Sequence, residues 1–163
     1  VTWADSPMLW LVTSMESSMI SKAAAADGAR SEFERLRICE RFPIINQDLS
    51  IENMAPEAER NRTAISYVKG CYLGQEVVAR IHYRGGVQRL PRGLRFAADR
   101  MPGAGAELLF EGRSVGRATS VTQSPRFGAI GLGLLHQRGA APGTPLEVVG
   151  GGVAEVVALP FGS

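Results

Sequence analysis

The segment 69–80 holds the densest group of residues that could do chemistry. It reads Lys-Gly-Cys-Tyr-Leu-Gly-Gln-Glu-Val-Val-Ala-Arg. Its apolar residues and a Glu/Arg pair four positions apart predict a short helix that begins near Gly74. Cys71 then precedes a helix N-terminus, where the helix dipole and nearby Lys69 favour a thiolate. The pattern predicts a reactive cysteine, whereas the usual behaviour of free cysteine predicts a packed, structural one.

The histidines raise two alternatives for this cysteine. Cys71 with His82 or His136 would make a nucleophile and its base, or part of a metal site. The spacing matches no known ligand pattern, and no cluster of carboxylates accompanies these residues. We therefore expect two surface histidines and no metal site.

Arginines are concentrated between residues 80 and 100, where Asp99 is the one acidic residue: Arg80, Arg84, Arg89, Arg92, Arg95 and Arg100. Tyr83 and Phe96 are interleaved with them, a composition suited to phosphate or an acidic partner. A solvated loop and strand face is the favoured alternative, because the whole chain has a net charge of only +2. We expect no direct binding of nucleic acid.

The elements that position these residues fall into two halves of different composition. Of 19 glycines, only Gly28 precedes residue 70. Residues 1–69 carry 8 basic and 10 acidic groups, whereas residues 70–163 carry 10 and 6. The Gly patterns Gly103-Ala-Gly105 and Gly131-Leu-Gly133 lack the setting of a dinucleotide fold and are read as strand and turn glycines.

The first half is expected to be partly helical. An apolar run predicts a buried strand at 8–12, followed by a helix over 13–27. A second capping-box pattern predicts a helix over 31–41 that Pro43 ends. The stretch 44–62 is polar and weakly periodic, so we expect a connecting segment that wraps over the surface rather than packs.

The second half is expected to be all β. Short runs with β-branched residues are bounded by glycine or proline, as in an antiparallel barrel or sandwich. Hairpin turns are expected at Glu111-Gly112 and at 150–152. The candidate strands are 94–96, 107–110, 114–121, 129–135, 146–149 and 153–159.

The segment 69–80 resembles a known family. The fingerprint Lys-Gly-Cys-Tyr/Phe-x-Gly-Gln-Glu-x-x-x-Arg/Lys marks the YgfZ proteins, folate-binding relatives of the glycine-cleavage T-protein. The T-protein usually lacks the cysteine, so Cys71 favours the YgfZ branch. The defining positions all match here: Lys69, Gly70, Cys71, Tyr72, Gly74, Gln75, Glu76 and Arg80.

The resemblance extends in both directions along the chain. Residues 37–43, Asp48 and 56–58 parallel the family's Arg-Ile-Glu-x-Gly-x-Pro, a following Asp, and a Pro-x-Glu-Ala segment. The tail is similar to the barrel shared with aminomethyltransferases, at Gly116, Ser120, Ser124, Pro125, Arg126, Gly128, Leu159, Pro160 and Phe161.

The resemblance implies an α+β fold: 1–87 as the C-terminal part of a T-protein-like folate-binding domain, then 88–163 as an antiparallel C-terminal β-barrel. It implies an accessory protein that binds tetrahydrofolate and helps assemble or repair iron-sulfur enzymes, including some that modify tRNA. The alternative is an enzyme, an aminomethyltransferase of the glycine cleavage T-protein type. Folate and iron-sulfur client enzymes are the implied partners.

Two departures from the family pattern change what we expect of the folate site. Relatives carry a glutamate that bonds the pterin, whereas this sequence has Cys39, with Glu40 one position along as the candidate folate-binding residue. Arg41 stands in place of the usual glycine. The chain resembles only the end of the second family domain and the third, so it looks like a fragment. We expect weak folate binding by this chain alone, and self-association or an open sheet edge.

Composition excludes several other classes. The chain is 45% hydrophobic and 21% charged, which is typical of a globular protein. No apolar run approaches the ~20 residues of a membrane-spanning helix, and no secretory signal is evident, so we expect a soluble, cytoplasmic protein. Two cysteines make no disulfide framework, and we expect both thiols to be free.

Overall fold

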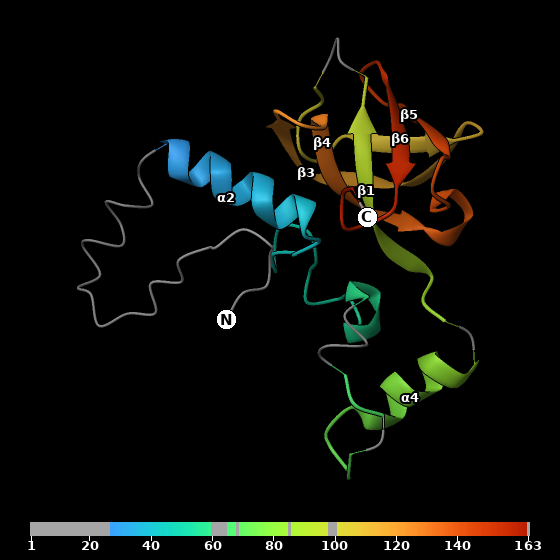
Figure 1. Ribbon diagram of the computed structural model, residues 1–163. Helices are drawn as coiled ribbons and strands as arrows, with labels where there is room; N and C mark the ends of the chain where they lie inside the picture. Colours follow the sequence, from blue (N-terminus) through green and yellow to red (C-terminus); the bar gives the residue numbers. More distant parts are fainter. Residues whose placement is uncertain (1–26, 60–64, 68, 85, 98–100, 163) are drawn as a thin grey trace.

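The computed structural model describes residues 27–59, 65–67, 69–84, 86–97 and 101–162 (Figure 1). The strand expected at 8–12 lies outside these residues, as does the helix expected over 13–27 except for its last residue.

Six antiparallel strands form a closed barrel in the order β1-β4-β3-β2-β5-β6, which confirms the expected all-β second half. The open sheet edge that we expected is therefore absent from the described strands. Each strand overlaps one of the six candidates. The strands are β1 (Arg89–Phe96), β2 (Glu107–Phe110), β3 (Arg113–Ser124), β4 (Gly128–His136), β5 (Pro145–Val148) and β6 (Val153–Val157).

The barrel core consists of apolar side chains contributed by alternate positions of all six strands. Glu111 and Gly112, with φ of 52° and 70°, close the β2–β3 hairpin as expected. Gly116 allows β3 and β4 to approach closely, because a Cβ there would lie 2.2 Å from the Leu134 carbonyl oxygen. The buried residues of this core are Leu94, Phe96, Leu108, Val115, Ala118, Ala129, Leu135, Ala140, Leu146, Val148, Ala154 and Val156.

Helix α2 (Asp27–Cys39) begins four residues earlier than expected. Ser31 therefore lies inside the helix rather than at its N-cap, and Glu34 bonds to Arg37 instead of completing a capping box. The C-terminus is a Schellman motif. Arg41 adopts a φ of 59°, and the N–H of Phe42 donates to the Arg37 carbonyl oxygen at 2.7 Å. The helix thus ends before Pro43, at a left-handed residue where the family has glycine.

The described residues of the stretch 44–62, which are 44–59, pack against the barrel, so the expectation that this stretch only wraps over the surface is wrong. Asp48, Leu49 and Pro56 are buried. The 3-10 helix η1 (Ala55–Ala58) contacts both β1 and helix α4.

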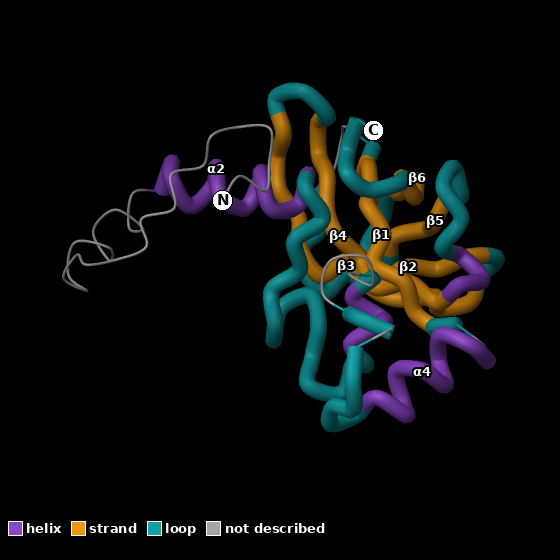
Figure 2. Tube along the Cα trace, turned by 60° about the horizontal axis from the view of Figure 1, so that its bottom comes forward, coloured by secondary structure: helices purple, strands orange, loops and turns teal. Residues whose placement is uncertain are grey.

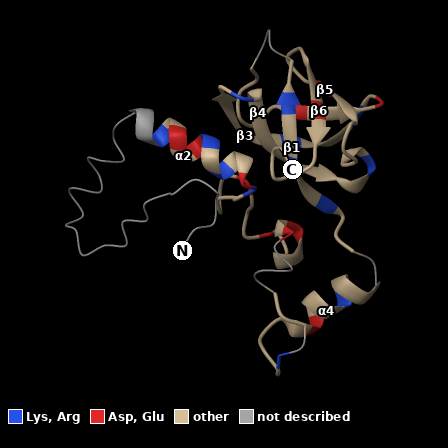
Figure 3. Ribbon diagram, in the orientation of Figure 1, with Lys and Arg blue, Asp and Glu red and all other residues tan. Residues whose placement is uncertain are grey.

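Helix α4 (Gln75–Arg84) begins one residue after Gly74, as the motif predicted. It lies apart from α2 in both Figure 1 and Figure 2. Charge is distributed differently between the parts: α2 is rich in both acidic and basic residues, whereas the barrel strands are mostly uncharged (Figure 3). None of the helices in the described ranges is long and apolar enough to span a bilayer.

Candidate functional site

A buried polar cluster joins α2 to the barrel, and we call Glu34, Arg37, Asp48, Thr119 and Ser120 the Arg37 cluster. The Arg37 side chain is fully buried. Its guanidinium donates to the Asp48 carboxylate at 2.8 Å, to the Ser120 hydroxyl at 2.6 Å and to the Glu34 carboxylate at 2.6 Å. A buried charge requires such partners, because its desolvation is otherwise costly.

Every lone-pair direction of Asp48 is used. One carboxylate oxygen accepts from Arg37 and, at 2.9 Å, from the Ile44 N–H. The other accepts from the Thr119 hydroxyl at 2.6 Å and the Ser120 hydroxyl at 2.5 Å. Consecutive side chains of a regular strand point to opposite faces. Both hydroxyls reach Asp48 because the register of β3 shifts between Ala118 and Ser120.

Cys39 and Glu40 lie at the end of α2, where the family resemblance placed the folate contact. The Cys39 thiol is buried beside Ile38, Ile130, Leu132 and Phe161. Burial raises the pKa of this thiol, which keeps it neutral. A neutral thiol in an apolar cluster does not replace a carboxylate that accepts from a pterin. The residue at position 39 therefore does not fit the family's folate contact.

The motif segment forms a turn that leads into α4. The Gln75 N–H donates to the Tyr72 carbonyl oxygen at 3.2 Å, and Gly74 adopts a φ of 85°. The Lys69 ammonium lies 4.6 Å from the centre of the Tyr72 ring. Both cysteines are free, as expected. Cys71 is exposed, whereas Cys39 is buried.

Apolar side chains of the motif segment are directed to solvent. Leu73 is fully exposed and Val77 is 51% exposed. They line an open hollow of about 830 Å³ together with Cys71. The apolar residues of α4 are not all packed: Val78 and Ile81 are half-buried, whereas Val77 is exposed.

Among the contacts of the described residues, neither His82 nor His136 forms a hydrogen bond with Cys71. His82 stacks on Tyr67 with 4.0 Å between ring centres. His136 accepts from the Arg138 N–H at 3.2 Å through Nδ1. The described residues contain no group of three metal-ligating side chains.

The arginine-rich stretch does not form one basic and aromatic surface. Phe96 lies in the barrel core. Arg92 bonds to the Glu59 carboxylate and the Ala140 carbonyl oxygen, both at 2.8 Å. Arg100 and the Arg84 side chain lie outside the described part of the molecule.

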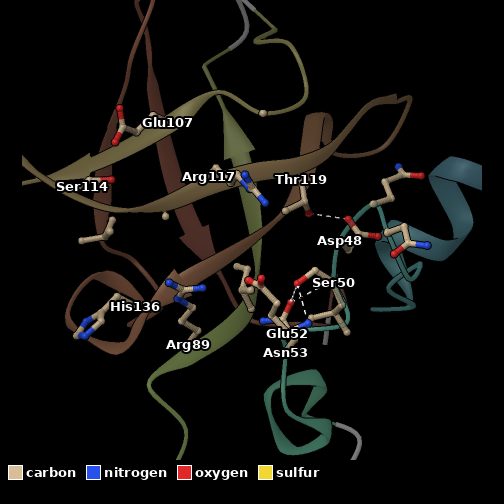
Figure 4. Close-up of a pocket in the computed structure, with 17 residues that line it drawn as sticks. Asp48, Ser50, Glu52, Asn53, Arg89, Glu107, Ser114, Arg117, Thr119 and His136 are labelled. Carbon is tan, nitrogen blue, oxygen red and sulfur yellow. Dashed lines mark hydrogen bonds between the residues drawn. The ribbon is translucent and has the colours of Figure 1, made fainter.

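A groove that the sequence did not reveal lies between residues 46–53 and the outer face of the barrel (Figure 4). Its volume is about 730 Å³. Arg89, Arg117 and His136 lie on the barrel side, and Glu52 lies on the loop side. Four strands and a loop contribute to it, so no local sequence pattern marks it.

Comparison with known proteins gives the class of this barrel. Residues 91–161 match the family of the glycine cleavage T-protein C-terminal barrel domain. The crystal structure of the glycine cleavage system aminomethyltransferase T from Bartonella henselae has the same fold, with a TM-score of 0.70 and 21% identity. The similarity covers 89% of this chain and 43% of that one.

Two sequence relatives narrow the class. The tRNA-modifying protein YgfZ of Yersinia enterocolitica is 38% identical over 104 residues, which are 60% of this chain and 31% of the relative. A chloroplastic protein of Arabidopsis thaliana, named as a candidate transferase, is 34% identical over 128 residues, which are 76% of this chain and 29% of the relative. The matched residues thus span about a third of the length of these relatives.

The chain belongs to the family of YgfZ and the glycine cleavage T-protein, and it matches the C-terminal portion of that family. This result confirms the resemblance drawn from the motif at 69–80.

Proposed function

We propose that this chain acts as part of an accessory protein that supports the assembly or repair of iron-sulfur enzymes, including enzymes that modify tRNA. The observation that carries the proposal is the complete motif, which presents Cys71 at the surface in the turn that leads into α4. An exposed thiol beside a helix N-terminus is accessible to a partner protein. The name of the Yersinia relative, a tRNA-modifying protein, supports this choice.

We propose that tetrahydrofolate binds only to a longer protein that also contains the preceding part of the family fold. Position 39 holds a buried neutral thiol, so it does not supply the pterin contact that the family has there. We expect calorimetric titration of the 163-residue chain with tetrahydrofolate to show weak binding or none. Submicromolar affinity would show that this portion holds a folate site by itself.

The test of the accessory role uses the gene in the cells that carry it. The gene is deleted and then restored with Cys71→Ser, and the product of an iron-sulfur tRNA-modifying enzyme is measured by mass spectrometry of tRNA nucleosides. We expect loss of that product with normal levels of the protein. The matched control is Cys39→Ala, which removes the other thiol and should retain activity. Normal activity of Cys71→Ser would leave the cysteine with a structural role only.

The second candidate function is transfer of a one-carbon unit to tetrahydrofolate. The shared fold with an aminomethyltransferase is the observation that favours it. Steady turnover by the purified full-length protein in a one-carbon transfer assay would replace the accessory role. The exposed cysteine of the motif, which the T-protein usually lacks, favours the accessory role.

A further inference from the structure

The groove between residues 46–53 and the barrel has the dimensions of a ligand site. Small-molecule sites have volumes of about 300–1,000 Å³, and this groove measures about 730 Å³. One wall is a β-sheet, and the other is a loop held by Asp48 and by a Ser50–Asn53 turn in which the Ser50 N–H donates to the Asn53 side chain at 2.7 Å.

The strand register places two basic residues and one acidic residue near one another on the outer face of the barrel. Arg89 is opposite His136 in the β1–β4 pairing. Arg117 is opposite Leu134 on β4 and opposite Glu107 on β2. Strand spacing and rise place the Cα atoms of Arg89 and Arg117 about 12 Å apart, so that both long side chains can reach one group between them. Figure 4 shows both side chains on the barrel side of the groove.

Both guanidinium groups are available for a ligand. Within the described residues, neither Arg89 nor Arg117 forms an ion pair or a side-chain hydrogen bond, and both are exposed. Asp48 also lines the groove, but its charge is matched by Arg37 and its oxygens are all engaged. The free carboxylates are those of Glu52 and Glu107, which can accept from hydroxyl groups.

We propose that this groove binds a small phosphate ester that carries hydroxyl groups, of the ribose phosphate class. Arg89 and Arg117 bind the phosphate, because guanidinium groups pair with phosphate oxygens through charge-assisted hydrogen bonds. Glu52 and Glu107 accept from the sugar hydroxyls. The groove does not include Cys39 or Glu40, so this site is separate from the expected folate contact and does not depend on the proposed function.

The test is titration of the full 163-residue chain with three probes: AMP, ribose 5-phosphate and adenosine. Two-dimensional NMR detects weak binding and locates it. We expect saturable shifts at Arg89, Arg117 and 46–53 with AMP, and none with adenosine. Equal affinity for ribose 5-phosphate would identify a sugar phosphate as the ligand, whereas tighter binding of AMP would identify a nucleotide.

Variants decide whether the two arginines bind the phosphate. Arg89→Gln and Arg117→Gln should each weaken AMP binding by about tenfold or more, as expected for loss of a charged hydrogen bond. Arg95→Gln is the matched control: it removes an exposed arginine of β1 that lies outside the groove, and it should leave affinity within about twofold. Thermal unfolding verifies that all three variants fold.

Three results would overturn the proposal. The first is an absence of shifts with millimolar AMP. The second is binding of adenosine as tight as that of AMP, which would remove the role of the phosphate. The third is an equal loss of affinity in Arg95→Gln, which would show only general attraction between AMP and a basic chain.

Discussion

The barrel and the segment that precedes it, residues 27–84, are stabilised in different ways. The barrel buries a continuous apolar core within a sheet that has no open edge. The preceding segment exposes large apolar residues, among them Ile51 at 90% and Leu73 at full exposure. It is joined to the barrel by a buried ion pair and its hydroxyl partners. The barrel therefore depends on packing, whereas the segment combines an apolar contact of Ile38 and Cys39 with the barrel and a buried ion pair.

This difference predicts which changes separate the two regions. Removal of one partner from a buried ion pair is strongly destabilising, because the remaining charge then lacks compensation. The exposed apolar residues of the segment also offer a surface for self-association, which we keep as a proposal that sedimentation can test.

The largest effect is expected for Asp48→Ala. The substitution leaves the buried Arg37 guanidinium without its main partner and should cost about 3 kcal/mol or more. Hydrogen exchange followed by mass spectrometry should show that α2 loses protection while the barrel strands retain it. The double variant Arg37→Met with Asp48→Leu should recover most of the loss. Equal loss of protection in the barrel would show that the two regions unfold as one unit.

Two leucines, one buried in the barrel and one exposed in the preceding segment, test how much packing stabilises each region. Leu94→Ala truncates a fully buried side chain of the barrel core and should destabilise the protein by about 3 kcal/mol. Leu73→Ala truncates a fully exposed one and should change stability by less than about 0.5 kcal/mol. Urea denaturation followed by circular dichroism measures both. A large effect of Leu73→Ala would mean that an associated copy covers this residue.

The left-handed residue after α2 provides a smaller test. Arg41 adopts a φ of 59° and bonds to Glu59, so Arg41→Gly and Arg41→Ala both lose the ion pair. Only the glycine variant relieves the backbone strain. We expect Arg41→Gly to be about 1 kcal/mol more stable than Arg41→Ala in thermal unfolding. Equal stability of the two variants would contradict the Schellman geometry at this helix end.

Alkylation of the two thiols reports on whether α2 stays docked on the barrel. Exposed Cys71 should react first. Burial raises the pKa of Cys39, so its thiolate is scarcer at any given pH and its reaction should begin only at higher pH. In Asp48→Ala, Cys39 should become reactive at the pH where Cys71 reacts, as followed by mass spectrometry. Continued protection of Cys39 in that variant would mean that α2 stays docked without the ion pair.

The barrel strands were predictable because local patterns specify them. β-Branched residues between glycine-rich turns marked six strands, and the Glu111-Gly112 turn was correctly placed. The one large error of extent is β1, which begins at Arg89 rather than at Leu94. Pro91 and Gly93 weaken the strand pattern there, and the pairing with β4 overrides their local preference.

The buried cluster and the groove were not predictable from local patterns. The sequence predicts no buried role for Arg37 or Asp48, because charged residues are usually exposed. Their burial depends on two hydroxyls of β3 that a register shift turns to the same side. The polar stretch 44–62 was misread for the same reason. Such contacts join residues far apart in sequence, which periodicity does not reveal.

The bond between Arg37 and Ser120 has a consequence for synthesis of the protein, since the two residues are 83 positions apart. At ribosomal rates of 5–20 residues per second, Arg37 is made on the order of 4–17 s before its partner on β3. During that interval its available partners are Glu34, three residues earlier on the same helix, and then Asp48, eleven residues later. Glu34 can therefore pair with Arg37 as soon as the helix has been synthesised. The bond to Ser120 forms only after β3 has been made and α2 has docked onto the barrel.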